Sequence, residues 1–209
     1  MKTATILIVA GFLAGGVFAQ NLDLPAPQKT GGLPLLDALS RRATSRAFDA
    51  TRELSPQQLS TLLWASWGIN RPDGRRTAPS ASNHQETDIY VLLKSGVFVY
   101  NAVSNRLDLV STNDVRSLGG TQSFVKDAPV TLVFVADLAK MGKGGGAGKL
   151  TTANIDVGFI SQNAYLYCAS EGLATGVRGS VDRAALAPRL NLATNQVIIV
   201  AQSVGYPKP

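Results

Sequence analysis

Two mostly apolar runs, residues 130–136 and 197–204, constrain the fold more than any other feature of the sequence. Runs of this length that lack helical spacing predict buried strands. Shorter apolar segments joined by tight turns, residues 89–93, 97–101 and 107–110, predict three further strands. The chain therefore needs a sheet at its centre, with at least two strands shielded from water.

Helical signals alternate with these strands. Ser55, Pro56 and Gln58 form a helix start with a cap, a proline in the first turn and a glutamine three positions after the cap. That helix is expected to end at Gly68. The other predicted helices span residues 33–43, with Leu35, Leu36 and Leu39 on one face, 155–171 and 181–186. The mixture predicts one α+β domain without internal repeats.

Composition limits the chemistry. The chain is 45% hydrophobic and 16% charged, which excludes intrinsic disorder. One cysteine excludes a disulfide within the chain, and one histidine excludes a multi-histidine zinc site, so no metal is expected. Cys168 lies in the apolar helix and is predicted to be a buried structural thiol. His84 is predicted to be a surface residue of a polar loop.

The N-terminus is typical of an export signal. Lys2 precedes an apolar run over residues 4–14, and small residues lead to Ala19. We therefore expect residues 1–19 to be a signal peptide cut after Ala19, giving a periplasmic or secreted protein without a stable membrane anchor. Residues 20–32, rich in proline and glycine, are expected to form an extended N-terminal arm before one domain over residues 33–209.

The formal net charge of +6 and two arginine clusters raise the question of a nucleic-acid partner. No helix-turn-helix, zinc-finger or RNA-binding signature is present, so none is expected. A solvated basic surface and a pocket for one small anion, such as a ligand phosphate, both remain open. The glycine-rich residues 142–149 fail the spacing of a phosphate-binding loop and are predicted to be a mobile surface loop.

Four segments in order carry a family resemblance. They are residues 41–48 (RRATSRAF), residues 76–85 (RTAPSASNHQ), Asp156-Val157-Gly158 with Gln162-Asn163, and residues 172–179 (GLATGVRG). Together they resemble the nitroreductase superfamily of FMN-dependent oxidoreductases. Residues 63–70 (LWASWGIN), followed by the second segment, look like the SagB-type dehydrogenase branch in particular. The resemblance implies a nitroreductase-like fold, with a mostly antiparallel central sheet flanked by helices, and a homodimer.

The resemblance also implies a set of FMN contacts. Arg42, Thr44 and Arg46 match residues that hold the phosphate, for which forked guanidinium groups are well suited. The loop with Pro79, Ser80 and Asn83 matches the one that reaches the flavin bound by the other subunit. The turn Gly176, Val177, Arg178 and Gly179 matches the segment that covers one flavin face and points a backbone N–H at flavin N5. Gln122 and Lys208 complete the cofactor-binding set.

Simpler explanations of these residues remain open. Arg42 also suits a solvated helix end, Ser80 and Asn83 suit an ordinary turn, and residues 176–179 suit a loop between helices. Many relatives have an acidic residue where Arg178 stands, and many carry a basic cluster in a C-terminal extension, of which this sequence offers Lys208 alone. No side chain is assigned as a catalytic acid or base.

The function implied by the resemblance is hydride or electron transfer between FMN and a small molecule, such as a nitro compound, a quinone or an azoline ring. Nicotinamide cofactors are scarce outside the cytoplasm, so the electron donor stays open for an exported protein. Two alternatives come from other classes. One is a flavin-binding or storage module without turnover, and the other is a fold relative that has lost FMN.

Overall fold

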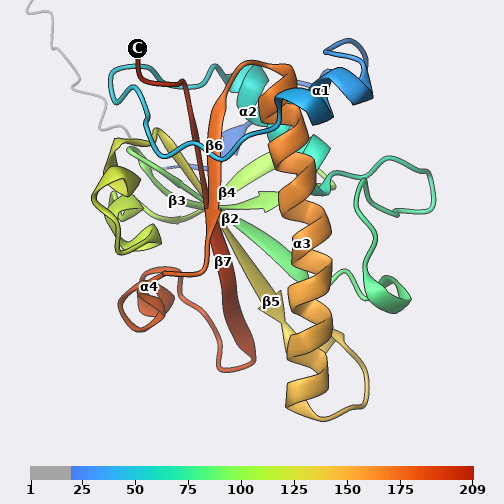
Figure 1. Ribbon diagram of the computed structural model, residues 1–209. Helices are drawn as coiled ribbons and strands as arrows, with labels where there is room; N and C mark the ends of the chain where they lie inside the picture. The colour runs from blue at the N-terminus through green and yellow to red at the C-terminus, as the bar shows by residue number, and fades with distance from the viewer. Residues whose placement is uncertain (1–19) are drawn as a thin grey trace, which may run out of the picture.

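A seven-stranded sheet forms the centre of the computed structural model, which describes residues 20–209 (Figure 1). The predicted signal peptide and its cleavage after Ala19 lie outside these residues. The strand order is β1-β4-β3-β2-β5-β7-β6, and every neighbouring pair is antiparallel. The α+β class and the antiparallel sheet expected from the sequence are confirmed.

The strands are β1 (Leu22–Asp23), β2 (Thr87–Leu93), β3 (Gly96–Asn101), β4 (Arg106–Ser111), β5 (Val130–Asp137), β6 (Ala174–Arg178) and β7 (Gln196–Gly205). All five predicted strands are present, with bounds that differ by up to two residues. β5 pairs with β2 on one edge and β7 on the other, and helices or turns cover both faces of the sheet. This double burial explains why β5 has a run of apolar residues instead of an alternating pattern.

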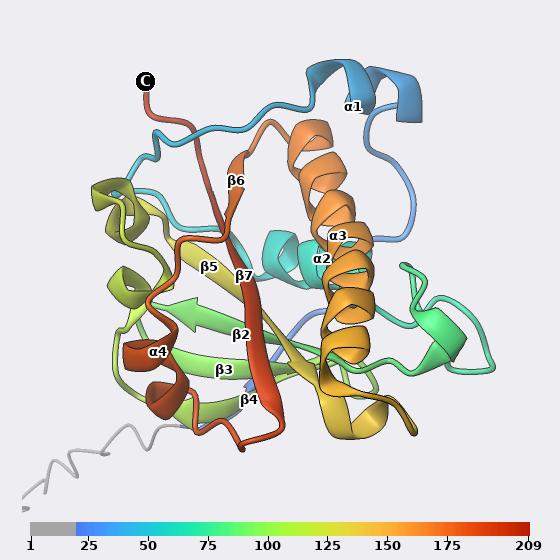
Figure 2. The ribbon, with the colours of Figure 1, turned by 60° about the horizontal axis from the view of Figure 1, so that its bottom comes forward.

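The helices are α1 (Leu35–Arg41), α2 (Pro56–Trp67), α3 (Gly146–Ser170) and α4 (Arg183–Arg189), with short 3-10 turns between them. α2 and α3 pack on one face of the sheet, where Leu62, Ile160 and Phe134 are fully buried in one cluster. α4 covers the opposite face, where Leu186 packs with Val133 (Figure 2). None of the helices within residues 20–209 is both long enough and apolar enough to cross a lipid bilayer.

The start of α2 follows the expected sequence signal. The Ser55 side chain accepts a hydrogen bond from the Gln58 amide, and the Gln58 side chain accepts one from the Ser55 amide. This reciprocal arrangement satisfies two amides that the helix itself leaves unpaired. Local sequence was sufficient here because all the partners lie within four residues.

Three helix predictions need correction. α3 begins at Gly146, so the second half of the predicted 142–149 surface loop is its first turn, where the Lys149 ammonium donates to the Leu138 carbonyl at 3.0 Å. α4 covers residues 183–189 instead of 181–186, because Asp182 caps it by accepting the Ala185 amide. α1 is shorter than predicted, and its leucines Leu35, Leu36 and Leu39 are exposed.

The expected turn over residues 176–179 is also wrong. Residues 176–178 belong to β6, which pairs with β7 at one edge of the sheet. Glycines at positions 172, 176 and 179 suggested a loop. Pairing with a ten-residue strand overrides that local preference, since β7 offers five partners in register.

Candidate cofactor-binding site

The segment that follows α1 leaves the helix at Arg42, whose φ of −55° and ψ of 120° are no longer helical. It then runs beside β6, where the Ser45 amide donates to the Thr175 carbonyl at 2.8 Å. Side chains of an extended segment alternate between two sides. Residues 42, 44 and 46 therefore share one side, and residues 43 and 45 share the other.

Tyr165 of α3 joins the first of these sides to β6. Its hydroxyl lies 3.0 Å from the Thr44 hydroxyl and accepts the Val177 amide at 2.9 Å. The Arg42 guanidinium lies over the Tyr165 ring, 5.5 Å from its centre. Two of the four predicted segments are thus brought together by a residue that sequence analysis missed. The available signal was a buried tyrosine on the predicted helix, since its hydroxyl needs a partner.

The second side borders a hollow of about 310 Å³ lined by Arg41, Ala43 and Ser45 together with Thr175. Cys168 of α3 also lines it, but this residue is fully buried. Burial raises the pKa of the Cys168 thiol to about 12, so the thiolate is not formed at neutral pH. The prediction of a structural cysteine is confirmed.

Positive charge gathers where this segment meets the C-terminus. The Lys208 amide donates to the Ala47 carbonyl at 3.3 Å, and Phe48 pairs with Pro207. Within residues 20–209, neither Arg42 nor Arg46 nor Lys208 has a carboxylate within 4.0 Å. Cations assembled without counter-charges suit an anionic ligand, and a phosphate matches the forked donors of arginine.

Gly176 is required by the packing of β6 against this segment. A Cβ atom at Gly176 would lie 2.8 Å from the Ser45 carbonyl oxygen, closer than real Cβ atoms come to a backbone atom. The absence of a side chain at Gly176 therefore allows β6 to come close to the backbone of the 42–46 segment.

The outer edge of β6 offers one further donor. The Thr175 carbonyl and the Val177 amide point away from β7, since Ser45 and Tyr165 bind them. Gly179 is the next residue on that edge, and its amide has no hydrogen-bond partner in the described part of the chain. The Gln122 side chain lies beside it, donating to the Ser180 hydroxyl. Gln122 therefore lies near the outer edge of β6, next to Gly179.

The Arg178 side chain turns the other way, into the protein. It is 8% exposed, its Nε donates to the Gly119 carbonyl at 2.8 Å, and one terminal nitrogen donates to the Ser203 hydroxyl at 2.9 Å. Burial lowers the pKa of Arg178 to about 10, which still leaves it charged at neutral pH. Its backbone belongs to the β6 edge, but its charge does not face the Arg42 side of that edge.

The loop with Pro79, Ser80 and Asn83 lies apart from the arginines. It is tied to α3 by the Ala81 amide, which donates to Asp156 at 2.9 Å. Asp156 precedes Tyr165 by nine residues, which is about 14 Å along a helix. The Ser80 and Asn83 side chains bind Gln85, so local turn chemistry accounts for both within one protomer. His84, expected at the surface, is half-buried.

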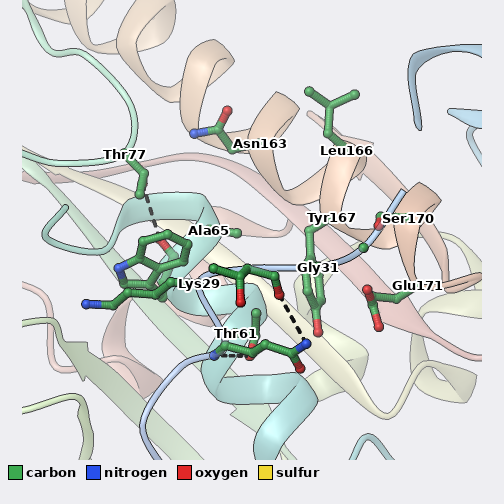
Figure 3. Close-up of a pocket in the computed structure, with 14 residues that line it drawn as sticks. Lys29, Gly31, Thr61, Ala65, Thr77, Asn163, Leu166, Tyr167, Ser170 and Glu171 are labelled. Atoms are coloured by element: carbon green, nitrogen blue, oxygen red, sulfur yellow. Dashed lines mark hydrogen bonds between the residues drawn. The ribbon is translucent and has the colours of Figure 1, made fainter. Parts of the chain in front are cut away.

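A second hollow, of about 320 Å³, lies between the N-terminal arm, α2 and the C-terminal half of α3. Figure 3 shows Asn163, Leu166 and Tyr167 of α3 on one side of it and Thr61 of α2 on another. None of the twelve predicted cofactor-binding residues lines this hollow or the smaller one described above. Arg46 and Lys208 are instead exposed and Arg42 is half-buried, so these three basic side chains lie at the surface.

Comparisons with known proteins agree with this fold. A model of the nitroreductase family matches residues 39–206. A relative from Methanocaldococcus jannaschii, described as a nitroreductase, is 27% identical over 153 residues, covering 68% of this chain and 77% of that protein. A crystal structure of a protein from Ralstonia eutropha JMP134, also described as a nitroreductase, is 39% identical with a TM-score of 0.87, covering 93% of this chain and 92% of the other.

A Staphylococcus epidermidis protein described as an NAD(P)H:FMN oxidoreductase has a TM-score of 0.66 at 15% identity. The match covers 88% of this chain and 92% of that one. At this identity the likeness is one of fold.

Proposed function

Since the chain belongs to the nitroreductase family and is an oxidoreductase of that family, we propose that it binds FMN and uses it to reduce or oxidise a small molecule. One observation carries the proposal. Arg42 and Arg46 have no carboxylate partner in the described chain, and Thr44 between them is linked through Tyr165 to the edge of β6.

In this proposal each residue has a defined task. Arg42, Thr44 and Arg46, with Lys208 beside them, hold the FMN phosphate. The Gly179 amide and Gln122, on the outer edge of β6, are the candidates for the flavin ring. FMN, when bound, supplies the two-electron chemistry, and the protein binds and orients it. The resemblance to the SagB-type branch adds azoline rings to nitro compounds and quinones as substrate classes.

An absorbance spectrum of the purified protein tests this proposal. After incubation with FMN and desalting, we expect flavin absorbance to elute with the protein. A reductant should bleach it, and an acceptor such as a quinone should restore it. Bleaching without acceptor-dependent recovery would indicate a storage module. A colourless protein after desalting would indicate a relative that has lost FMN.

We also propose that the protein is a homodimer. α1 exposes Leu36 at 77% and α3 exposes Phe159 at 48%, and both helices lie on the same side of the molecule (Figures 1 and 2). A closed two-fold contact would cover these apolar side chains. It would also allow the Pro79–Asn83 loop of one protomer to reach the flavin bound by the other.

Sedimentation at micromolar concentration should give about twice the chain mass. Replacing Phe159 with glutamate should shift the equilibrium toward monomer, because a charge would be buried in the contact. Val103→Glu is the matched control, since Val103 is also apolar and exposed but lies in the turn between β3 and β4. A strict monomer that binds FMN tightly would contradict the role of Asn83 across the contact.

We further propose export, with cleavage after Ala19. The support is the charged residue, apolar run and small residues of the N-terminal sequence. An exported enzyme would meet FMN after crossing the membrane and would need an electron donor other than cytoplasmic nicotinamide cofactors.

A further inference from the structure

A pair of buried acidic residues lies beneath the Pro79–Gln85 loop. Glu86, just before β2, is 0% exposed, and Asp156 of α3 is 3% exposed. Neither carboxyl oxygen of Glu86 has a hydrogen-bond donor among residues 20–209. Asp156 interacts with this carboxyl and is held at the same loop by the Ala81 amide, so two acceptor-only groups would meet if both were ionised.

The surroundings of Glu86 disfavour its charge. Burial raises the pKa of this carboxyl, and the nearby Asp156 raises it further. The Glu86 backbone amide and the Lys140 ammonium oppose this rise, but Lys140 already pairs with Asp88 at 3.1 Å. A neutral Glu86 can donate its proton to Asp156, which turns two repelling acceptors into a hydrogen bond.

Asp156 connects this pair to the loop. Its Oδ2 accepts the Ala81 amide at 2.9 Å, the sole hydrogen bond between the loop and α3 in the described chain. Ser82, Asn83 and Gln85 have φ values of 51°, 55° and 48°, a region that residues with side chains rarely adopt. Such backbone persists only when its surroundings hold it.

We propose that Glu86 and Asp156 share a single proton and that this shared proton holds Asp156 where it anchors the loop at Ala81. Both are positioning residues, because neither lies at the predicted flavin contacts. Loss of the proton places two charges side by side in a buried site, which should displace Asp156 and release the loop. The consequence for flavin rests on the proposed function, in which Ser80 and Asn83 of this loop reach the flavin across the dimer.

The pH dependence has a definite sign. In the closed state Glu86 keeps its proton, whereas in an opened state its pKa returns toward its ordinary value of 4.5. Above that value the open state binds fewer protons, so opening becomes more favourable as pH rises. The opening equilibrium should grow by up to about tenfold per pH unit until Glu86 ionises in the closed state as well.

Amide hydrogen exchange of the flavin-free protein tests the anchor. The protection of Ala81, corrected for the intrinsic rate at each pH, should fall in wild type by up to about tenfold per pH unit. Glu86→Gln should remove this dependence, because an amide donates to Asp156 without titrating. Asp182→Asn is the matched control: its carboxylate also accepts a backbone amide, that of Ala185 at 3.0 Å, but it caps α4 on the other face of the sheet.

Equal pH dependence of Ala81 protection in wild type and Glu86→Gln would overturn the proposal. An infrared spectrum provides a second measurement if the variant does not fold. As pH rises through the range where ordinary carboxyls ionise, wild type should keep the band of one protonated carboxylic acid after the other carboxyls have lost theirs, and loss of all the bands together would also contradict the shared proton. An FMN titration separates the two proposals. If FMN affinity falls as pH rises in wild type but not in Glu86→Gln, both the shared proton and the flavin function are supported. If Ala81 protection depends on pH but the protein does not bind FMN, the shared proton is supported and the flavin function is contradicted.

Discussion

We expect Arg42→Ala to weaken FMN binding by roughly ten- to a hundredfold and to leave riboflavin binding nearly unchanged. A hydrogen bond to a charged group contributes about 1.5–3 kcal/mol, and about 1.4 kcal/mol is a factor of ten. Riboflavin lacks the phosphate and should not depend on this arginine. The measurement is quenching of flavin fluorescence in titrations of both flavins against both proteins.

Arg41→Ala is the matched control for that prediction. It removes the same charge one residue earlier, but Arg41 lines the hollow on the other side of the segment. Its effect on FMN should stay within about fivefold, the size of a screened surface interaction. Wild type should prefer FMN to riboflavin, and the preference should shrink as salt rises. Equal wild-type affinity for the two flavins would show that the basic cluster does not bind the phosphate and is only a solvated surface.

The second large effect is expected from Gly176→Val. A Cβ at position 176 would already lie 2.8 Å from the Ser45 carbonyl oxygen. The two methyl groups of valine add further bulk, and a backbone oxygen cannot rotate away as a flexible side chain can. Overpacking of this kind costs about 1–3 kcal/mol of folding stability. Because the displaced segment carries Arg42 and Arg46, FMN affinity should fall as well. Urea unfolding and the FMN titration measure the two effects.

Two other glycines serve as controls for Gly176→Val. Gly179 lies in the same region, but a Cβ added there would meet no atom of residues 20–209 within 4 Å, so Gly179→Ala should leave folding stability nearly unchanged. Gly158→Ala, in α3, also enters open space and should raise stability by up to about 1 kcal/mol, since alanine is the better helix former. If Gly176→Val were as stable as wild type, the close approach of β6 to Ser45 would be incorrect.

The elements that sequence analysis predicted well are those whose signals are local. The Ser55 cap and its glutamine are reciprocal partners three residues apart, so both ends of the interaction are visible in the sequence. β5 and β7 were recognisable because strands buried on both faces are mostly apolar along their length. The burial of Cys168 followed in the same way from its apolar neighbours.

The sequence also determined, through the order of its segments, which family the chain belongs to and which residues are candidates for the cofactor. Only the tertiary structure decided how those candidates meet. Residues 176–178 became a strand because β7 lies beside them, and Tyr165 joined that strand to Thr44 across 121 residues of chain. A local sequence pattern cannot predict a contact between residues so far apart in the chain.

Charge placement depended on tertiary structure for the same reason. Arg178 and Arg42 look alike in the sequence. The Arg178 guanidinium is buried against Gly119 and Ser203, whereas the Arg42 guanidinium lies over the Tyr165 ring and has no carboxylate partner among residues 20–209. Glu86 precedes a predicted strand and carries no sequence signal of its own. Burial raises the pKa of its carboxyl, and Asp156, 70 residues later, raises that pKa further, because two neighbouring buried carboxylates are costly to leave ionised.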